Sequence, residues 1–348
     1  MSGERSRGGS PLGLDTRGRR RYSSFVRRPP DEEIRIANRA TYWPVAPMDL
    51  LIATPLVARA LFGVTPLGRA VKVAALGLYL GSALRDWRDR RRIRRVAFLG
   101  EFGADGRHLT PMPRERREAE VAALAERLND GLVLARPSRR ELAIEVEQRL
   151  VDYIASITGQ RVRSSAEVRS FGLVGLAFPS ALGACDILTG DVALFRDAGF
   201  FEPHIIAHEF SHRKGYWKEL DAQVLGYLAL VESGEPRLVQ SALLERLYRN
   251  LRVLAHGDEA AFDRLATRAA LRPELAATLR RLRPPSHLVG RGLDAGMRRV
   301  YDARMRVTGQ NGLSDYDLGF TNFLYTFETS RIARQAPPAI ALHAPSRA

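Results

Sequence analysis

Residues 208–219 contain the side chains with the clearest capacity for chemistry. The run at 208–212 reads His-Glu-Phe-Ser-His, which is the pattern H-E-x-x-H. On a helix, His208 and His212 lie one turn apart on one face, so both imidazoles can bind one zinc ion at about 2.0–2.1 Å. Glu209 then lies about 100° around the helix, close to the open position of the metal. The spacing predicts a zinc site in which Glu209 acts as the general base.

A third ligand is expected from the segment that follows. Gly215, three residues after His212, can adopt the left-handed conformation that ends a helix and turns the chain back. Glu219 comes next, at the start of a second apolar helix, and a carboxylate completes a two-histidine site with one open position. Asp221 is the alternative ligand, although it would point to a different face of that helix. We favour Glu219.

Other polar residues near this motif have simpler explanations. His204 extends the stripe of histidines, but ligands eight residues apart on a straight helix cannot converge on one metal, so we expect a helix cap or a substrate-side residue. Three tyrosines could donate a hydroxyl to an oxyanion, yet packing in the core is the commoner role of buried tyrosine. The predicted catalytic set therefore leaves out Tyr301, Tyr316 and Tyr325.

The composition of the chain limits the classes of protein to which it can belong. The chain has 348 residues, 45% of them hydrophobic, which is enough for a sizeable core. The single cysteine, Cys185, excludes a disulfide framework and any multi-cysteine metal site. The net charge of +15 is carried mostly by arginine, and we expect Lys214 and Lys218 to face solvent. No recognised nucleic-acid module accompanies this charge, so no nucleic-acid partner is predicted.

Two apolar runs, Leu50–Leu67 and Val71–Leu84, occupy most of residues 46–86. Pro66 and Gly68 mark a turn between them, which predicts an apolar helical hairpin. Both runs are marginal for a bilayer, because the first contains a charge and the second is short. A soluble hairpin that packs on the rest of the protein is therefore the alternative to a membrane hairpin.

Arginine clusters at 17–39 and 85–95 flank the hairpin. By the positive-inside tendency they favour a membrane anchor with both ends in the cytoplasm, and we expect their side chains to face lipid headgroups or solvent. Residues 1–45 are rich in glycine, serine, proline and arginine and are predicted to be a disordered tail.

The remaining chain is expected to be mainly α with a small sheet. Residues 87–160 have a helical rhythm and are predicted to be a helical lead-in. Glycine-punctuated β-branched residues predict short strands between Arg161 and Ala198, and helices follow from Pro203 almost to Arg334. We therefore place a catalytic domain at 161–335 and a disordered tail at 336–348.

Residues His208–Gly215 and Glu219–Ala229 resemble the core of the bacterial family called domain of unknown function 3810. Similar stretches occur upstream at Gly172–Pro179 and downstream at Val300–Asp302 and Gly309–Tyr316. The resemblance implies a membrane-anchored zinc metallopeptidase of the gluzincin type, with a zincin-like fold. It also implies zinc on His208, His212 and Glu219, with Glu209 as the base, and transmembrane helices ahead of the catalytic domain.

Two positions depart from that pattern. Ser180–Gly183 stands where the family has Phe-Thr-Gly-Glu, which puts a substrate-side role for that glutamate in doubt. Gln223 replaces the usual Asn or Asp, and we expect it to hydrogen-bond a ligand imidazole.

These observations predict a membrane-associated zinc-dependent peptidase that hydrolyses peptide bonds of protein or peptide substrates. Membrane lipid is the other expected partner, and the catalytic domain is expected to face the cytoplasm from the cell membrane. The alternative is a non-catalytic membrane adaptor or scaffold that retains a zincin-like fold. An arginine-driven binder of lipid surfaces or nucleic acid, with strong salt dependence, is a further alternative.

Overall fold

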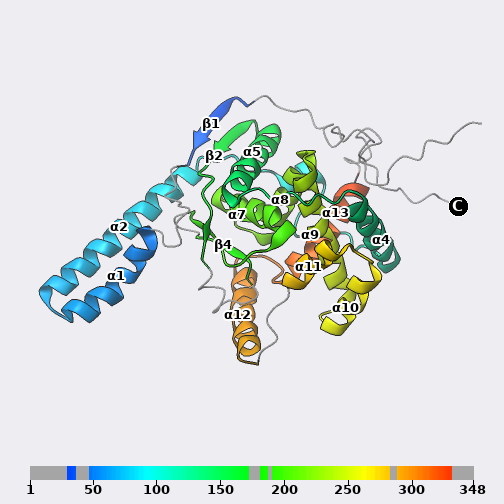
Figure 1. Ribbon diagram of the computed structural model, residues 1–348. Coiled ribbons are helices and arrows are strands. Elements are labelled where there is room, and N and C mark those ends of the chain that lie inside the picture. Colours follow the sequence, from blue (N-terminus) through cyan, green and yellow to red (C-terminus); the bar gives the residue numbers. More distant parts are fainter. Residues whose placement is uncertain (1–29, 37–46, 172–180, 187–189, 283–287, 331–348) are drawn as a thin grey trace, which may run out of the picture.

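Helices dominate the computed structural model, which describes residues 30–36, 47–171, 181–186, 190–282 and 288–330 (Figure 1). The expectation of a mainly helical chain with small sheets is confirmed. The predicted tail at 336–348 and the stretch 172–180 lie outside the described residues. The α-helices are α1 Pro47–Phe62, α2 Pro66–Arg90, α3 Phe98–Phe102, α4 Arg114–Asp130, α5 Arg139–Thr158, α7 Glu202–Arg213, α8 Glu219–Glu232, α9 Pro236–Ala255, α10 Glu259–Arg268, α11 Pro273–Arg281, α12 Leu288–Val307 and α13 Phe320–Thr329. A 3₁₀ turn, Gly199–Phe201, precedes α7, and a π-helical segment, Asp315–Gly319, precedes α13.

Short strands form where the glycine-punctuated segment predicted them. β3 (Arg169–Ser170), β5 (Val192–Leu194) and β4 (Gly183–Cys185) make a sheet in that order, with β4 antiparallel to β5 at the edge of the described strands. β2 (Gln160–Arg163) pairs in parallel with β1 (Glu32–Arg35).

The prediction that residues 1–45 form a disordered tail is wrong for one segment, because Glu32–Arg35 form strand β1. Ile34 and Ile36 alternate with polar residues and are both buried, and Ile36 packs with Ile93 and Val162. This period of two gives the segment one apolar face, and β1 pairs with β2 so that Ile34 lies opposite Val162. Residues 1–29 and 37–45 of the predicted tail lie outside the described residues.

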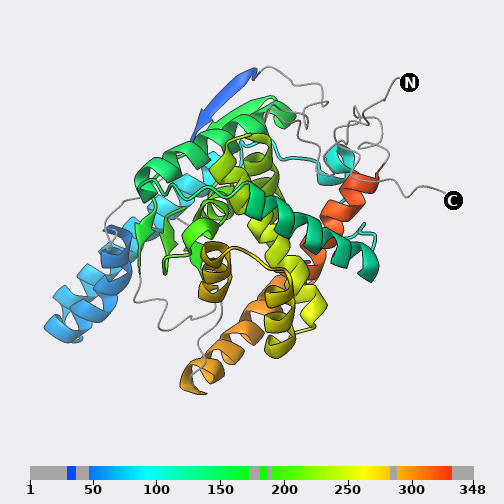
Figure 2. The ribbon, with the colours of Figure 1, turned by 45° about the vertical axis from the view of Figure 1, so that its right-hand side comes forward.

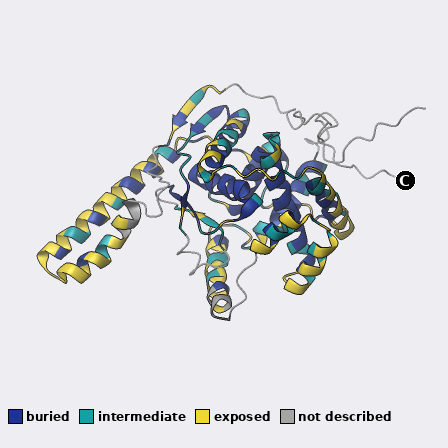
Figure 3. Cartoon of the chain, in the orientation of Figure 1, coloured by how far each residue is buried: buried dark blue, intermediate teal, exposed yellow. Residues whose placement is uncertain are grey.

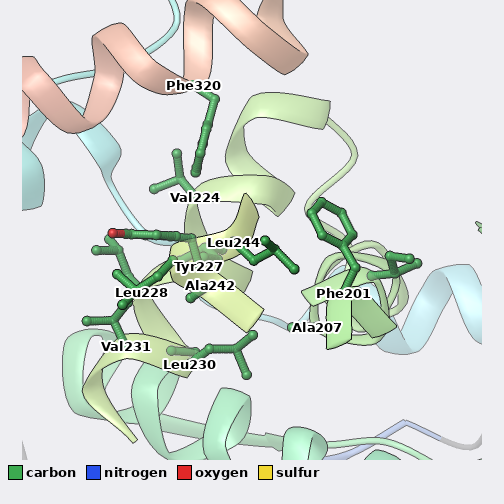
Figure 4. Packing of buried hydrophobic residues seen from close by; sticks show 14 of the residues in the cluster. Phe201, Ala207, Val224, Tyr227, Leu228, Leu230, Val231, Ala242, Leu244 and Phe320 are labelled. Carbon is green, nitrogen blue, oxygen red and sulfur yellow. The ribbon is translucent and has the colours of Figure 1, made fainter. Parts of the chain in front are cut away.

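The core is built around the packed pair α7 and α8. α8 is apolar on all sides, which is the pattern of a helix surrounded by protein. Figure 4 shows its residues Val224 and Tyr227 among side chains of α9 and beside Phe320 of α13. Turning the molecule shows α5 and α9 lying around the same centre (Figure 2).

The helical lead-in, residues 87–160, belongs to this core. Leu124 of α4 and Leu150 of α5 are fully buried in the same cluster as Phe210 and Leu225. Residue 161 is therefore a change of secondary structure rather than the start of a separate core.

A buried ionic network joins three helices of the core. Arg246 of α9 contacts Glu120 of α4 and Glu328 of α13, with Nη2 at 2.8 Å from Oε2 of Glu120 and 3.0 Å from Oε2 of Glu328. Asn250 donates to Glu120 at 2.8 Å. These hydrogen bonds satisfy charges that would be costly to bury alone.

The predicted hairpin forms and projects from the body of the molecule (Figures 1 and 3). α2, with 25 residues, is long and apolar enough to cross a membrane, whereas the apolar part of α1 is the shorter segment Ala53–Phe62. Only 22% of the most apolar window of α2 is buried. Large apolar side chains such as Leu56, Val73 and Leu78 are exposed on the hairpin.

The arginines of the cluster at 85–95 are exposed as expected, except for Arg90. Arg90 is buried, and its Nε donates to the carbonyl of Arg213 at 3.0 Å, while Arg95 donates to the carbonyl of Lys214 at 2.8 Å. Both guanidinium groups thus satisfy carbonyls at the C-terminal end of α7, where positive charge is favourable. Arg90 therefore does not face lipid or solvent as predicted, whereas Arg95 is exposed.

Lys214 also differs from expectation, whereas Lys218 is exposed as predicted. Lys214 is fully buried, with Nζ 2.6 Å from Oε1 of Glu147 and 3.0 Å from the carbonyl of Val162. Because α7 ends inside the protein, the residue after it has no route to solvent and pairs with a carboxylate instead.

Candidate metal centre

α7 carries the H-E-x-x-H motif through the centre of the core. Pro203 lies in its first turn, where a missing N–H costs nothing, and every residue of the helix is buried. The helix ends at Arg213, and Gly215, two residues later, has the predicted left-handed conformation with a φ of +87°. The chain then returns as α8, which begins at Glu219.

A glycine allows the two helices to approach closely at the site. A Cβ on Gly226 of α8 would lie 3.1 Å from the backbone nitrogen of His208 and 3.2 Å from the carbonyl carbon of Ala207. Any larger residue would push α8 away from α7. The close contact brings the first turn of α8 within reach of both motif histidines.

Three side chains converge on one point. Nε2 of His208, Nε2 of His212 and Oε2 of Glu219 are each 3.1 Å from the other two. The structure therefore brings together the three predicted ligands, and Asp221 is not among them. All three residues are buried.

This triangle fits a small tetrahedral metal ion. Donors bound to zinc at 2.0–2.1 Å with tetrahedral angles lie about 3.3 Å apart, close to the observed separations. Nδ1 of His212 lies 2.7 Å from the carbonyl of Tyr216, so Nδ1 carries a hydrogen, and in the neutral ring Nε2 directs its lone pair at the triangle. The donor set, two imidazoles and one carboxylate, also suits zinc.

Two tyrosines hold the carboxylate of Glu219. The hydroxyl of Tyr316 donates to Oε2 at 2.7 Å, and the hydroxyl of Tyr301 donates to Oε1. The backbone N–H of Glu219 donates to Oε1 of Gln310 at 2.8 Å. We expected core packing for both tyrosines, so their contact with a candidate ligand is new. In the sequence, the one feature that pointed to Tyr301 and Tyr316 is that they lie in the stretches 300–302 and 309–316, which resemble the family pattern.

Burial and mutual charge shift the pKa values of the three groups in opposite directions. Burial lowers the pKa of His208 to about 4. Burial also opposes protonation of His212, but the charge of Glu219 and its hydrogen bond outweigh it and raise the pKa to about 9. Burial opposes ionisation of Glu219, yet the neighbouring imidazoles hold its pKa well below the usual range.

Glu209 lies beside this triangle without belonging to it. Its carboxylate is buried and accepts a hydrogen bond from the backbone N–H of Cys185 on β4. Burial, together with the charge of Glu219, raises the pKa of Glu209 to about 7. A carboxylate of this kind can hold or release a proton near neutral pH.

A cavity of about 580 Å³ opens onto the site. Glu209, all three members of the triangle and both tyrosines line it, as do β4 and the α12 residues Met297 and Arg298. The cavity is large enough for several residues of an extended chain or for a small ligand.

Three residues considered in the sequence take other positions. Asp221 is half-buried outside the triangle, and burial, with Asp105 and Asp315 nearby, raises its pKa to about 6. Tyr325 is not among the residues that line the cavity. His204 does line it, and its backbone N–H donates to Oγ of Ser241, so it is not a side-chain cap of α7.

The expectation that Gln223 hydrogen-bonds a ligand imidazole is wrong. Its Nε2 donates to the carbonyl of Tyr316 at 3.0 Å and to Glu245, and among the described residues no ligand imidazole contacts it. Because Gln223 lies one turn beyond Glu219 on α8, its side chain faces Glu245 on α9 instead of His208 or His212.

No curated protein and no solved structure matches the chain. One family model matches part of it, from just before α7 into α13, and this part contains the triangle, Glu209 and both tyrosines. The resemblance read from the sequence is confirmed over that stretch: residues 198–325 match the family described as Protein of unknown function (DUF3810).

Proposed function

We propose that this protein is a membrane-associated, zinc-dependent peptidase with a zincin-like catalytic domain. One observation carries the proposal: the two Nε2 atoms of His208 and His212 and Oε2 of Glu219 form a 3.1 Å triangle at the wall of a large cavity, with Glu209 beside it. A purely structural zinc site has no need of an extra buried glutamate or an adjoining cavity.

His208, His212 and Glu219 would hold the ion. Bound zinc supplies Lewis acidity, which polarises a carbonyl group and makes water more acidic at its open position. Glu209 accepts the proton of the attacking water and passes it to the nitrogen of the leaving amine. Tyr301 and Tyr316 orient Glu219, and the carbonyl of Tyr216 orients His212.

The position of β4 favours a peptide substrate. This strand lies at the edge of the sheet as the described residues form it, and Gly183, Ala184 and Cys185 line the cavity. An extended peptide can add to a sheet edge through main-chain hydrogen bonds, with little dependence on side-chain identity. Hydrolysis of an amide in such a chain is the reaction that this arrangement supports best.

The exposed apolar hairpin supports membrane association. The length and composition of α2 and its low burial are what a lipid-facing helix requires. Arginines at both ends of the hairpin favour a cytoplasmic position for the catalytic domain.

The test compares zinc content and peptide hydrolysis in wild type and Glu209→Gln. We expect one zinc ion per chain in both proteins and hydrolysis only in wild type, because Glu209 is a base and not a ligand. Glu118→Gln, an exposed position on α4, is the matched control and should resemble wild type. Zinc-loaded wild type that cleaves no member of a broad peptide library would point to the non-catalytic adaptor.

A further inference from the structure

A second polar cluster lies one helical turn from the candidate ligands. His204 precedes His208 by four residues on α7, and Gln223 follows Glu219 by four residues on α8, a displacement of about 6 Å along each helix. Glu245 of α9 joins them, with Oε1 3.4 Å from Nε2 of His204 and hydrogen-bonded by Gln223. We call His204, Gln223 and Glu245 the inner cluster. All three line the same cavity as the metal ligands.

Each member of the inner cluster has one polar atom without a partner among the described residues. These atoms are Nδ1 of His204, Oε1 of Gln223 and Oε2 of Glu245. The three residues are at most 4% exposed. Buried polar atoms normally have hydrogen-bond partners, because an unmade bond in a protein interior costs free energy. The three residues line one cavity, so a donor group bound there would supply the missing partners.

All three atoms are hydrogen-bond acceptors. Nε2 of His204 lies 3.4 Å from Oε1 of Glu245, so Nε2 carries a hydrogen, and in the neutral ring Nδ1 is an acceptor. Gln223 uses its amide nitrogen for two acceptors, which leaves its carbonyl oxygen free. Glu245 is ionised: burial opposes this, but Arg249 and His204 lower its pKa to about 2. The cluster can therefore bind only a group that donates.

Glu245 is the acidic member of the inner cluster, and its carboxylate favours a donor that carries positive charge. Arg249 contacts both Glu245 and Asp317, with Nε 2.7 Å from Oε1 of Glu245 and Nη1 2.9 Å from Oδ1 of Asp317. The guanidinium of Arg249 thus reaches both carboxylates but leaves Oε2 of Glu245 without a donor among the described residues. The aromatic rings of Phe201 and Tyr248 also line the cavity and provide an apolar wall for a methylene chain.

We propose that the inner cluster is a specificity subsite for a primary ammonium group of the substrate, next to the bond that is cleaved. This inference rests on the proposed peptidase function and names its substrate class. An ammonium group has three N–H donors and so matches the three unpartnered acceptors. The separation of one helical turn between this cluster and the metal ligands is within reach of a residue adjoining the scissile bond.

Two sources can supply the ammonium group: a lysine side chain or the free amino terminus of a peptide. Peptide binding to zinc-loaded Glu209→Gln separates them without any need for turnover. The probes are blocked peptides, acetylated and amidated, that differ only in lysine, norleucine or glutamate at one position. The same norleucine peptide with a free amino terminus completes the set.

We expect the lysine peptide, the free-terminus peptide or both to bind roughly 10–100-fold more tightly than blocked norleucine peptide, because charge-assisted hydrogen bonds replace the missing partners. A preference for the lysine probe alone assigns a side-chain subsite, and a preference for the free terminus alone assigns an aminopeptidase subsite. Equal binding of all probes, or tightest binding of the glutamate probe, overturns the proposal.

Glu245→Gln in the Glu209→Gln background should remove most of this preference, whereas Glu235→Gln, outside the cavity, should retain it. If Glu245→Gln does not fold, the binding of the lysine and free-terminus probes relative to blocked norleucine in the parent protein still tests the proposal. Equal wild-type turnover of the blocked norleucine, blocked lysine and free-terminus norleucine peptides would refute the subsite and leave the peptidase function standing. Absence of turnover with every peptide would instead refute the function.

Discussion

The hydroxyl of Tyr316 donates a 2.7 Å hydrogen bond to Oε2 of Glu219, the oxygen that also lies 3.1 Å from both motif imidazoles. The two residues are 97 positions apart in the chain. Glu219 is thereby held from two sides, since Tyr301 donates to its other oxygen. The carboxylate is oriented before any metal arrives, which lowers the entropy lost on binding.

Tyr316→Phe is therefore expected to weaken zinc binding by about 10–100-fold without unfolding the protein, as loss of an outer hydrogen bond to a ligand usually does. Competition with a chromophoric chelator measures the affinity. Tyr325→Phe on α13, outside the cavity, is the control and should bind zinc as wild type does. Equal affinity in the two variants would show that Tyr316 only packs.

His212→Ala should lose zinc, because it removes one of three donors and leaves a site with two. Asp221→Asn should retain one zinc ion per chain, since Asp221 lies outside the triangle. Metal analysis of the purified proteins by mass spectrometry checks both. Zinc in His212→Ala equal to wild type would refute the assigned site, and loss of zinc in Asp221→Asn would make Asp221 a ligand.

Arg246→Met should destabilise the fold by about 3–5 kcal/mol, because it leaves Glu120 and Glu328 buried without their cation. Denaturant unfolding followed by circular dichroism gives the free energy of unfolding. Arg114→Ala removes an exposed ion pair with Glu118 and should cost less than about 1 kcal/mol. Similar losses in the two variants would mean that the buried network is not a major source of stability.

Glu245 should make stability depend on pH in the acid range. Burial opposes its ionisation, but Arg249 and His204 lower its pKa from 4.5 to about 2, so the folded state binds the proton less tightly than the unfolded state. Its contribution, of the order of 3 kcal/mol, is complete above about pH 4.5 and is lost as the pH falls towards about 2. Unfolding curves between pH 2 and 7 should show this slope in wild type and a flatter one in Glu245→Gln. A parallel slope in both proteins would assign the acid sensitivity to other carboxylates.

The hairpin should hold the protein in membranes during carbonate extraction. The double variant Leu76→Arg and Leu78→Arg places charges at positions 54% and 65% exposed, each costing about 2.5–3.5 kcal/mol inside a bilayer, and should shift the protein to the soluble fraction. Leu134→Arg, at a position 58% exposed outside the hairpin, should leave fractionation unchanged. Release of wild type by carbonate would establish the soluble hairpin.

The side of the membrane that the catalytic domain faces is a separate prediction. The arginine clusters at both ends of the hairpin predict that a reporter fused to the C-terminus stays protected when protease is added outside intact cells. Cleavage of that reporter would reverse the predicted orientation.

The sequence by itself determined the features that depend on local periodicity. His208 and His212 are neighbours because a helix repeats every 3.6 residues, and the chain turns back after them because Gly215 accepts a φ of +87°. The apolar hairpin likewise follows from two apolar runs around a proline and a glycine. These features need no knowledge of distant residues, and the structure contains each of them.

Only the tertiary structure decided which distant groups meet. Tyr301 and Tyr316 reach Glu219 across 82 and 97 positions, and Lys214 finds Glu147 across 67. Each of these residue types has an ordinary alternative, core packing for tyrosine and solvent for lysine, and composition does not choose between them. The choice depends on how α7, α8 and α9 pack. Burial makes an unpaired polar group costly in their interfaces, and its partner is whatever the packing places within hydrogen-bond distance.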